Sequence, residues 1–276
     1  MKNPWQFDFH KAGIINQERM LEAANRPGKT QCAAAEVAMH MTGLYPDWWE
    51  GKRFNNPVLV WTGSPTNETS RDIVQKALLG GTDNQNLGSG WISRHLIYGK
   101  PRPRQAGVPD VVDQFKVKHV SGGYSQCIMK TYEQGWRKWQ GTEPDIVWLD
   151  EEPDQSADQA KIFTEALTRL LTSHGIMMVT FTPLLGQTDL VMHFEENQGR
   201  DGVWLGKATW DDAPHLIKKE RERLMMSYPL GDRDWETKIF TEALTRLLTS
   251  HGIMMVTFPS HDHRGDKTSL IFLFLF

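Results

Sequence analysis

The sequence has little cysteine, no long apolar run at its end and almost no net charge. Its 276 residues include two cysteines, Cys32 and Cys127, with no Cys-x-x-Cys pair and no leader peptide, which favours a reducing cytosol over a disulfide-stapled secreted domain. The closing apolar run, residues 270–276, has seven residues, whereas a helix that spans a bilayer needs about 20. We therefore expect no membrane role.

The charge balance argues against a protein that coats nucleic acid through its overall charge. Lys and Arg total 31 and Asp and Glu total 34, which gives a net charge of −3. Any site for a polyanion must therefore be local. With 39% hydrophobic and 24% charged residues, the composition is that of a globular protein with one sizeable core, or a core plus a small second unit.

Short apolar runs alternate with helix-period segments along the chain. Runs such as "DIVWLD" and "GIMMVTF" are apolar at nearly every position, which indicates strands buried on both faces. We therefore predict an α/β fold with a mainly parallel sheet flanked by helices. The expected strands are residues 19–23, 57–62, 115–120, 125–131, 145–149, 176–181 and 203–208, and the expected helices are residues 30–41, 68–79, 157–172 and 215–226.

One segment of the chain occurs twice. The 21 residues "KIFTEALTRLLTSHGIMMVTF" occupy residues 161–181 and recur, letter for letter, at residues 238–258. Repeat architectures need about three copies, so an identical pair indicates a duplication, a recombination joint or an assembly fault. Because one strand position in a sheet takes one copy, we expect the first copy to lie in the sheet.

A short motif between an expected strand and an Ala-rich helix is typical of a phosphate-binding loop. Gly28, Lys29 and Thr30 stand where backbone N–H groups and a helix N-terminus hold a phosphate, a Lys reaches the β- and γ-phosphates and a hydroxyl holds Mg²⁺. We expect Gln31, which follows them, to belong to the same nucleotide-binding set. The full pattern GxxxxGK[ST] would place Gly at position 23, where this chain has Ala23. The motif alone is therefore a weak signal.

Acidic residues follow the apolar run at residues 146–149. Asp150 could orient Mg²⁺ through water, and Glu151 could polarise the water that attacks the γ-phosphate. The alternative is a solvated strand end, with Asp154 or Ser156 capping the next helix. We expect Glu152 and Asp154 to have structural roles in either case.

Seven stretches, in this order, resemble the large subunit of tailed-phage terminases, the ATP-driven motors that package DNA into procapsids. The resemblance extends over roughly residues 1–236 and implies a P-loop ATPase fold of the RecA/ASCE type. The stretches are "PWQFDFHKAG" (4–13), "AANRPGKTQ" (23–31), "TGSPTNETSRDIVQ" (62–75), "YEQGWRKWQG" (132–141), "VWLDEEP" (147–153), "MVTFTPLLG" (178–186) and "TWDDAPHL" (209–216).

The resemblance implies a role for each matching residue of the two central motifs. Lys29 and Thr30 match the Lys and hydroxyl of the phosphate loop, with Mg²⁺ held at Thr30 and Asp150. Glu151 matches the catalytic Glu. The implied cofactors are ATP and Mg²⁺.

Four further residues match positions outside those motifs. Gln6 is similar to a glutamine that contacts adenine, although a surface glutamine is the alternative. Thr180 and Thr182 resemble the segment that senses the γ-phosphate, although threonine also favours strands. Arg26 could stabilise charge on the γ-phosphate as an arginine finger in cis, or be an exposed loop residue.

The chain also departs from the family pattern. Pro27 removes one N–H group from the loop and restricts the residue before it. Beyond Trp235, where the family continues into a two-metal nuclease, the duplicated segment follows. We expect an ATPase core at residues 1–210, a helical linker or lid at 211–236, and the duplicated segment with an unstructured tail at 237–276, without nuclease activity. A truncated prophage remnant with weak or no ATPase activity is the alternative; a helicase-like ATPase is a more distant one.

The resemblance also implies partners. These are double-stranded DNA, the portal protein, the small terminase subunit and further copies of the chain in a ring, in the cytoplasm of the bacterial host. Local basic clusters that could grip DNA phosphates are residues 99–105, Lys116 with Lys118, and residues 136–139, although solubilising surface charge is the more frequent explanation of any one cluster.

Overall fold

The computed structural model describes residues 3–24, 27–81, 86–105, 108–153, 160–182, 188–200, 202–209 and 212, and the backbone of 253–261 and 267–275. The chain divides into two compact units, Met1–Ile217 and Lys218–Phe276. The larger unit contains an eight-stranded sheet, and the smaller one contains a two-stranded sheet. Among the described residues, no helix has the length and apolar character needed to cross a membrane.

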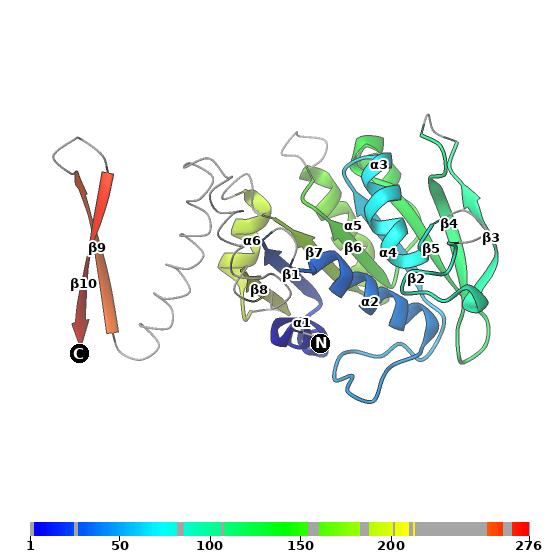
Figure 1. Ribbon diagram of the computed structural model, residues 1–276, viewed down its shortest axis with the longest axis horizontal. Coiled ribbons are helices and arrows are strands. Elements are labelled where there is room, and N and C mark those ends of the chain that lie inside the picture. Colours follow the sequence, from blue (N-terminus) through cyan, green and yellow to red (C-terminus); the bar gives the residue numbers. More distant parts are fainter. Residues whose placement is uncertain are drawn as a thin grey trace. The chain divides into compact units, whose positions relative to one another are not determined.

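The large sheet has the order β3-β4-β5-β2-β6-β7-β1-β8 (Figure 1). In this order, the six strands from β5 to β8 run parallel to one another. Strand β4 is antiparallel to β5, and β3 is antiparallel to β4. The strands are β1 (Glu18–Ala23), β2 (Leu59–Ser64), β3 (Ile97–Pro103), β4 (Val112–Lys118), β5 (Tyr124–Thr131), β6 (Ile146–Asp150), β7 (Ile176–Phe181) and β8 (Val203–Ala208).

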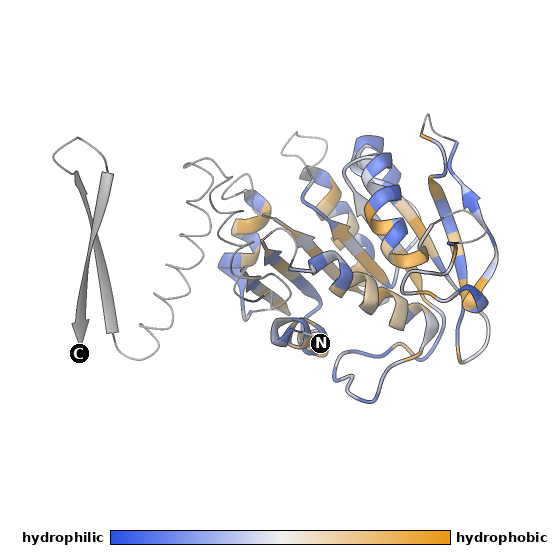
Figure 2. Cartoon of the chain, viewed as in Figure 1, coloured by the Kyte–Doolittle hydropathy of each residue, from blue (hydrophilic) through white to orange (hydrophobic). Residues whose placement is uncertain are grey.

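Helices cover both faces of this sheet. One apolar cluster packs helices α1, α2 and α4 against alternate residues of the strands, and a second packs α5 and α6 against the residues between them. Figure 2 shows the apolar residues gathered in the central strands. The helices are α1 (Pro4–Ala12), α2 (Lys29–Thr42), α3 (Asn67–Thr69), α4 (Lys76–Leu79), α5 (Ala160–Ser173) and α6 (Asp189–Asn197), with shorter helical turns η1 (Ser70–Gln75), η2 (Arg94–Leu96), η3 (Tyr132–Gln134) and η4 (Trp136–Trp139).

The α/β fold class predicted from the sequence is confirmed, and all seven expected strands form with bounds shifted by a few residues. The single helix expected at residues 68–79 is wrong in detail, because a π-helical turn, η1, separates α3 from α4. Helices α1 and α6 and strand β3 were not predicted from the sequence. The helix expected at 215–226 lies outside the described residues.

The duplicated segment forms two different structures. The first copy supplies α5 and β7, and β7 lies between β6 and β1 in the parallel sheet. In the second copy, residues 253–258 belong to β9 (Ile253–His261), which is antiparallel to β10 (Lys267–Leu275). Residues 238–252 lie outside the described part of the chain. The same six residues, at 176–181 and at 253–258, therefore form a parallel strand in one place and an antiparallel strand in the other, according to their context.

A buried charged network joins α1, β1 and α2. The Arg19 guanidinium donates to Glu36 Oε1 at 2.5 Å and to the Phe9 backbone carbonyl at 2.7 Å. His10 Nδ1 lies 2.6 Å from Glu36 Oε2, and His40 Nε2 lies 3.2 Å from Glu36 Oε1. Burial opposes the charge on Glu36, but Arg19 and the two histidines hold the pKa of this carboxyl well below its ordinary value. The network therefore fixes α1 to the strand and helix that flank residues 24–28.

We predict that Glu36→Gln lowers the free energy of unfolding by about 3–5 kcal/mol, because the buried Arg19 guanidinium loses its counter-charge. Urea unfolding at neutral pH measures this. Since the pKa of Glu36 is lowered by folding, its contribution is complete above its ordinary pKa of 4.5 and is lost as the pH falls through the lower folded value. The difference between the two proteins should therefore shrink in acid.

Glu50→Gln is the matched control, because Glu50 pairs with Lys11 on the surface with both side chains 65% exposed. It should leave the stability almost unchanged. An equal effect of both substitutions would contradict a structural role for the buried network.

Candidate active site

Three parallel strands bring the candidate residues to one edge of the sheet. Strands β6, β7 and β1 are neighbours in that order, and all run the same way. Their carboxyl ends therefore meet, and this is the edge at which open α/β sheets bind ligands. The segment after β1 leads into α2, while β6 ends at Asp150 and β7 is followed by Thr182.

The start of α2 has the backbone of an anion-binding turn. Gly28 is its N-cap with φ 102° and ψ 26°, a left-handed conformation that glycine adopts without strain. Because Gly28 has no side chain, it cannot accept from the first N–H groups of the helix as a Ser or Asp cap would. These N–H groups and the positive end of the helix dipole favour a bound anion.

The Lys29 side chain contacts residues that follow both β6 and β7. Its Nζ donates to Thr182 Oγ1 at 2.5 Å and lies 3.2 Å from Glu151 Oε1. The Lys29 side chain is 8% exposed, whereas that of Glu151 is 36% exposed. The ammonium is thus held at the bottom of the site, with the more accessible carboxylate beside it.

Asp150 is a buried acid with two hydroxyl donors. Its Oδ1 accepts from Thr30 Oγ1 at 3.0 Å and from Thr180 Oγ1 at 2.8 Å, and Thr180 in turn accepts from Trp148 Nε1 at 2.8 Å. Burial, together with the neighbouring Glu151, raises the pKa of Asp150 to about 7, although the two hydroxyls and Lys29 oppose the shift. A cation beside this acid would therefore stabilise its ionised form.

Glu151 is held in an unusual backbone conformation. Its φ is 63°, in the left-handed region that non-glycine residues rarely adopt. Its N–H donates to the Thr180 carbonyl at 2.7 Å, its carbonyl accepts from the Tyr132 hydroxyl at 2.8 Å, and its Oε2 accepts from the Thr182 N–H at 3.1 Å. The strand end therefore turns sharply and aims this carboxylate at the loop that begins α2.

The remaining predicted residues lie around this centre. A Cβ atom placed on Gly28 would lie 3.6 Å from Gln6 Nε2, so the amide of Gln6 adjoins the loop. Gln31 points elsewhere, because its Oε1 accepts from Trp91 Nε1 at 2.9 Å. Arg26 lies outside the described residues. The structure thus brings together six predicted side chains: Lys29, Thr30, Asp150, Glu151, Thr180 and Thr182.

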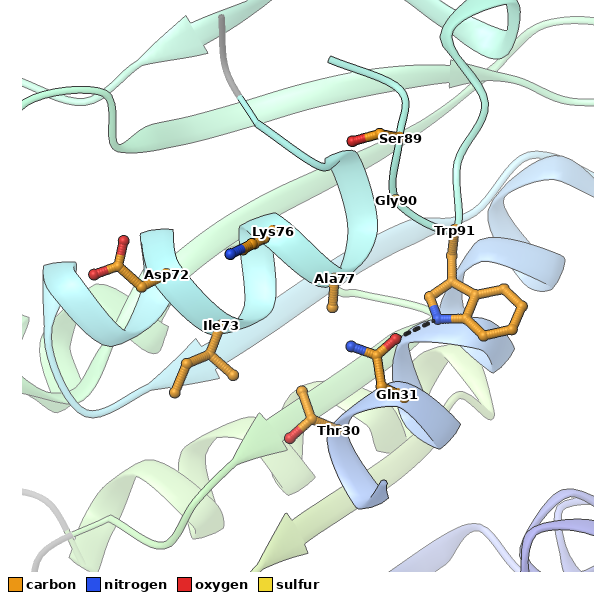
Figure 3. Close-up of a pocket in the computed structure, with 9 residues that line it drawn as sticks. All are labelled: Thr30, Gln31, Asp72, Ile73, Lys76, Ala77, Ser89, Gly90 and Trp91. Atoms are coloured by element: carbon orange, nitrogen blue, oxygen red, sulfur yellow. Dashed lines mark hydrogen bonds between the residues drawn. The ribbon is translucent and has the colours of Figure 1, made fainter. Parts of the chain in front are cut away.

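A hollow of about 530 Å³ lies beside the start of α2. Figure 3 shows residues of η1 and α4 on one side of it, Thr30 and Gln31 on another, and the indole of Trp91 hydrogen-bonded to Gln31. The lining residues are Thr30, Gln31, Asp72, Ile73, Lys76, Ala77, Ser89, Gly90 and Trp91. No role was predicted from the sequence for Trp91, which lies outside the seven stretches, or for Tyr132, which begins the stretch at 132–141 but has no charge to mark it.

The oxygen ligands here suit a hard divalent cation. Among the described residues, no group of three or more His, Cys, Asp or Glu side chains could hold a metal by itself. The hydroxyl of Thr30 and the carboxylate of Asp150 instead offer a few protein oxygens, as Mg²⁺ sites do when phosphate oxygens supply further ligands. The residues present therefore fit Mg²⁺ bound together with a polyphosphate.

Comparisons with known proteins identify sequence relatives. The large terminase subunit of Salmonella phage P22 is 36% identical over 248 residues, which are 83% of this chain and 48% of that protein. The large terminase subunit of Enterobacteria phage LP7 is 32% identical over 73 residues, 26% of this chain and 15% of that protein. The chain thus spans about half the length, or less, of these relatives.

Two solved structures share the fold. The ATPase domain of the Thermus phage P74-26 large terminase has a TM-score of 0.60 at 13% identity, over 84% of this chain and 91% of that one. The large terminase of a thermophilic bacteriophage, in complex with ADP, has a TM-score of 0.60 at 12% identity, over 82% of this chain and 50% of that one. These likenesses show that this chain shares the fold of large-terminase ATPase domains.

The family match covers most of the chain. Residues 20–238 match the family described as terminase large subunit, T4likevirus-type, N-terminal. This range contains the loop before α2, the acids after β6 and the threonines at the end of β7. The chain therefore belongs to the terminase large-subunit family, and its larger unit has the fold of that family's ATPase domain.

Proposed function

We propose that this chain hydrolyses ATP as the motor part of a phage terminase and that hydrolysis moves double-stranded DNA into procapsids. The observation that carries the proposal is the meeting of Lys29, Thr30, Asp150 and Glu151 at one sheet edge. Relatives support it, because the large terminase of the thermophilic bacteriophage was solved with ADP and with ATP-γ-S.

The start of α2 would bind the triphosphate. The left-handed Gly28 turns the backbone so that successive N–H groups converge, and the Lys29 ammonium adds a full positive charge. Because Lys29 contacts both Glu151 and Thr182, its ammonium can exchange one of these contacts for a phosphate oxygen and keep the other. Pro27 removes one N–H group, and we expect the remaining amides to carry the binding.

Thr30 and Asp150 would hold Mg²⁺. When bound, Mg²⁺ neutralises charge that develops on the phosphates. The Thr30 hydroxyl can give up its bond to Asp150, because Thr180 also donates to the same carboxylate oxygen. Asp150 therefore keeps its orientation while one of its partners changes.

Glu151 would accept a proton from the attacking water. Its carboxylate is the more exposed of the two acids. Thr180 and Tyr132 hold its backbone, and the Thr182 N–H donates to its carboxylate. Thr182 contacts both Lys29 and Glu151, which supports its proposed role in sensing the γ-phosphate. Thr180, near the end of β7, donates to Asp150 and so connects the proposed Mg²⁺ ligand to the same strand end as Thr182.

The wider assembly is part of the proposal. We propose that further copies form a ring, that Arg26 completes the phosphate site in cis, and that Gln31 supports the loop through Trp91. The portal protein and the small terminase subunit are the proposed partners in the host cytoplasm. The proposed ATPase core is residues 1–210, the proposed linker or lid is residues 211–236, and residues 237–276 are the duplicated segment with the tail that follows it.

Replacing Glu151 tests the catalytic assignment. Glu151→Gln should lower Mg²⁺-dependent ATP hydrolysis by at least about 100-fold, because the amide cannot accept the proton, while nucleotide binding survives. Phosphate release and equilibrium binding measure the two effects. Glu152→Gln is the control: Glu152 is the half-buried neighbour of Glu151 and is expected to have a structural role, so this variant should keep most of the activity. Equal turnover by wild type and Glu151→Gln would refute the role given to Glu151.

Replacing Asp150 tests the cost of its burial. The pKa of Asp150, raised to about 7 from 3.8, means that the fold loses stability as the pH rises through this interval, because the ionised carboxylate is poorly solvated. At pH 8 without nucleotide, Asp150→Asn should therefore raise the free energy of unfolding by at least about 1 kcal/mol. It should also abolish Mg²⁺-dependent hydrolysis. A destabilised, active variant would contradict both assignments.

Replacing Gln6 tests the base contact. Gln6→Ala should weaken ATP binding by about tenfold and GTP binding much less, because a side-chain amide can donate to and accept from adenine. Competition titrations with both nucleotides measure the ratio. The same loss for ATP and GTP would indicate that Gln6 supports the loop rather than the base.

A further inference from the structure

The antiparallel strands β3, β4 and β5, at one edge of the sheet, have an exposed face that carries lysines and lies outside the proposed nucleotide site. In β4, the buried side chains Phe115 and Val117 join the core cluster shared with α2 and α4. Lys116 and Lys118 alternate with them and are exposed on the opposite face. Strand alternation thus separates a covered face from a solvent-facing one.

Two tyrosines share the exposed face with these lysines. Tyr98 of β3 lies directly opposite Lys116, and Tyr124 of β5 lies directly opposite Lys118 in the strand ladder. Cross-strand partners project to the same side of a sheet. The two tyrosine rings stack with centroids 3.9 Å apart and are 47% and 46% exposed.

The charge on this face has one sign. Every residue of β4 and β5 is described, and on this face the two strands carry no Asp or Glu, only Gln114, Lys116, Lys118, Tyr124, Gln126, Ile128 and Lys130. Asp113, the one carboxylate of β4, alternates to the covered side and lies 3.6 Å from Arg104 Nε. A chain with a net charge of −3 thus has a locally cationic surface.

The basic clusters seen in the sequence converge here, with one correction. In residues 136–139, Trp136 and Trp139 pack on the side of the sheet that carries Ile128, which places exposed Arg137 and Lys138 on that side. In residues 99–105, Lys100 and Arg102 are exposed on the neighbouring strand β3, and Arg102 Nε lies 3.9 Å from Asp113 Oδ2. Arg104 is not a phosphate ligand in this structure, because it is turned inward and donates to Asn67 Oδ1 and to the Met129 carbonyl.

We propose that the surface formed by Tyr98, Lys116, Lys118 and Tyr124, which we call the β4 lysine face, binds the phosphate backbone of double-stranded DNA. This inference rests on the proposed function, because it names the surface that a DNA motor would use. Lys116 and Lys118 lie two strand residues apart, roughly 6.8 Å, so each amine can reach its own phosphate. Tyrosine hydroxyls also donate to phosphate oxygens.

The stacked rings favour a duplex over a single strand. Single-stranded nucleic acids bind through bases that stack on free aromatic faces. Each tyrosine ring of the β4 lysine face already packs against the other, with centroids 3.9 Å apart and planes tilted by 30°, which leaves the exposed lysine amines as the groups free to meet a ligand. The two backbones of a duplex lie on its outside and present rows of phosphates to such a surface.

The test is binding of the full chain to a labelled duplex of about 30 base pairs, followed by fluorescence anisotropy over a range of salt concentrations. Lys116→Ala with Lys118→Ala should raise Kd by about tenfold or more and reduce the slope of log Kd against log salt by about 2. Lys116→Arg with Lys118→Arg keeps the charge and should restore binding. Lys11→Ala with Arg200→Ala, which removes the same charge from exposed positions elsewhere, should change Kd by less than about twofold.

Three outcomes would overturn the proposal. They are equal losses in the two double-alanine variants, no binding of the duplex by wild type at low salt, and tighter binding of the corresponding single strand. Basal ATP hydrolysis without DNA, measured on the same preparations, separates this proposal from the previous one. Hydrolysis without duplex binding rejects only the β4 lysine face; lysine-dependent binding without hydrolysis rejects only the motor.

Discussion

The ion pair between the Lys29 ammonium and the Glu151 carboxylate, next in sequence to the buried Asp150, is the contact on which the site depends. Lys29 lies 3.2 Å from the Glu151 carboxylate because α2 begins at this lysine, and the left-handed Gly28 before it turns the chain toward β6 and β7. Without that cation, Asp150 and Glu151 would stand side by side at a buried strand end with only hydroxyl and amide donors. Such an arrangement is costly to fold and suits a site that binds further positive charge.

The rest of the fold supports this contact from both sides. The buried Glu36, with Arg19 and two histidines, fixes α1 against β1 and α2, and so keeps Gln6 beside Gly28. From the other side, Trp148 orients Thr180, which in turn donates to Asp150. One set of hydrogen bonds, around Glu36, therefore positions the elements next to the loop, and a second set, from Trp148 through Thr180, positions Asp150. Both sets act at the same edge of the sheet.

Local pattern in the sequence was enough to predict the parallel strands and the two halves of the site. Continuous apolar runs located the strands, and the Gly-Lys-Thr motif and the acids after residues 146–149 predicted two neighbouring ends of one site. Edge strand β3 was missed because "IYGKPRP" has two prolines and no apolar alternation, yet pairing with β4 holds it in place. The roles of Trp91 and Glu36 depend on contacts between residues far apart in sequence, which periodicity does not report. The positive φ of Glu151 is likewise imposed by its tertiary contacts.

The most direct test of the central contact is calorimetric titration of the protein with Mg²⁺ and ATP-γ-S, comparing wild type with Lys29→Ala and with Lys11→Ala. A nucleotide site at this sheet edge predicts saturable binding to wild type and to Lys11→Ala, with a loss of at least about 100-fold in Lys29→Ala. Unfolding curves of the three proteins show whether each is folded. Equal affinity of a folded Lys29→Ala variant, or no binding by wild type, would contradict that site.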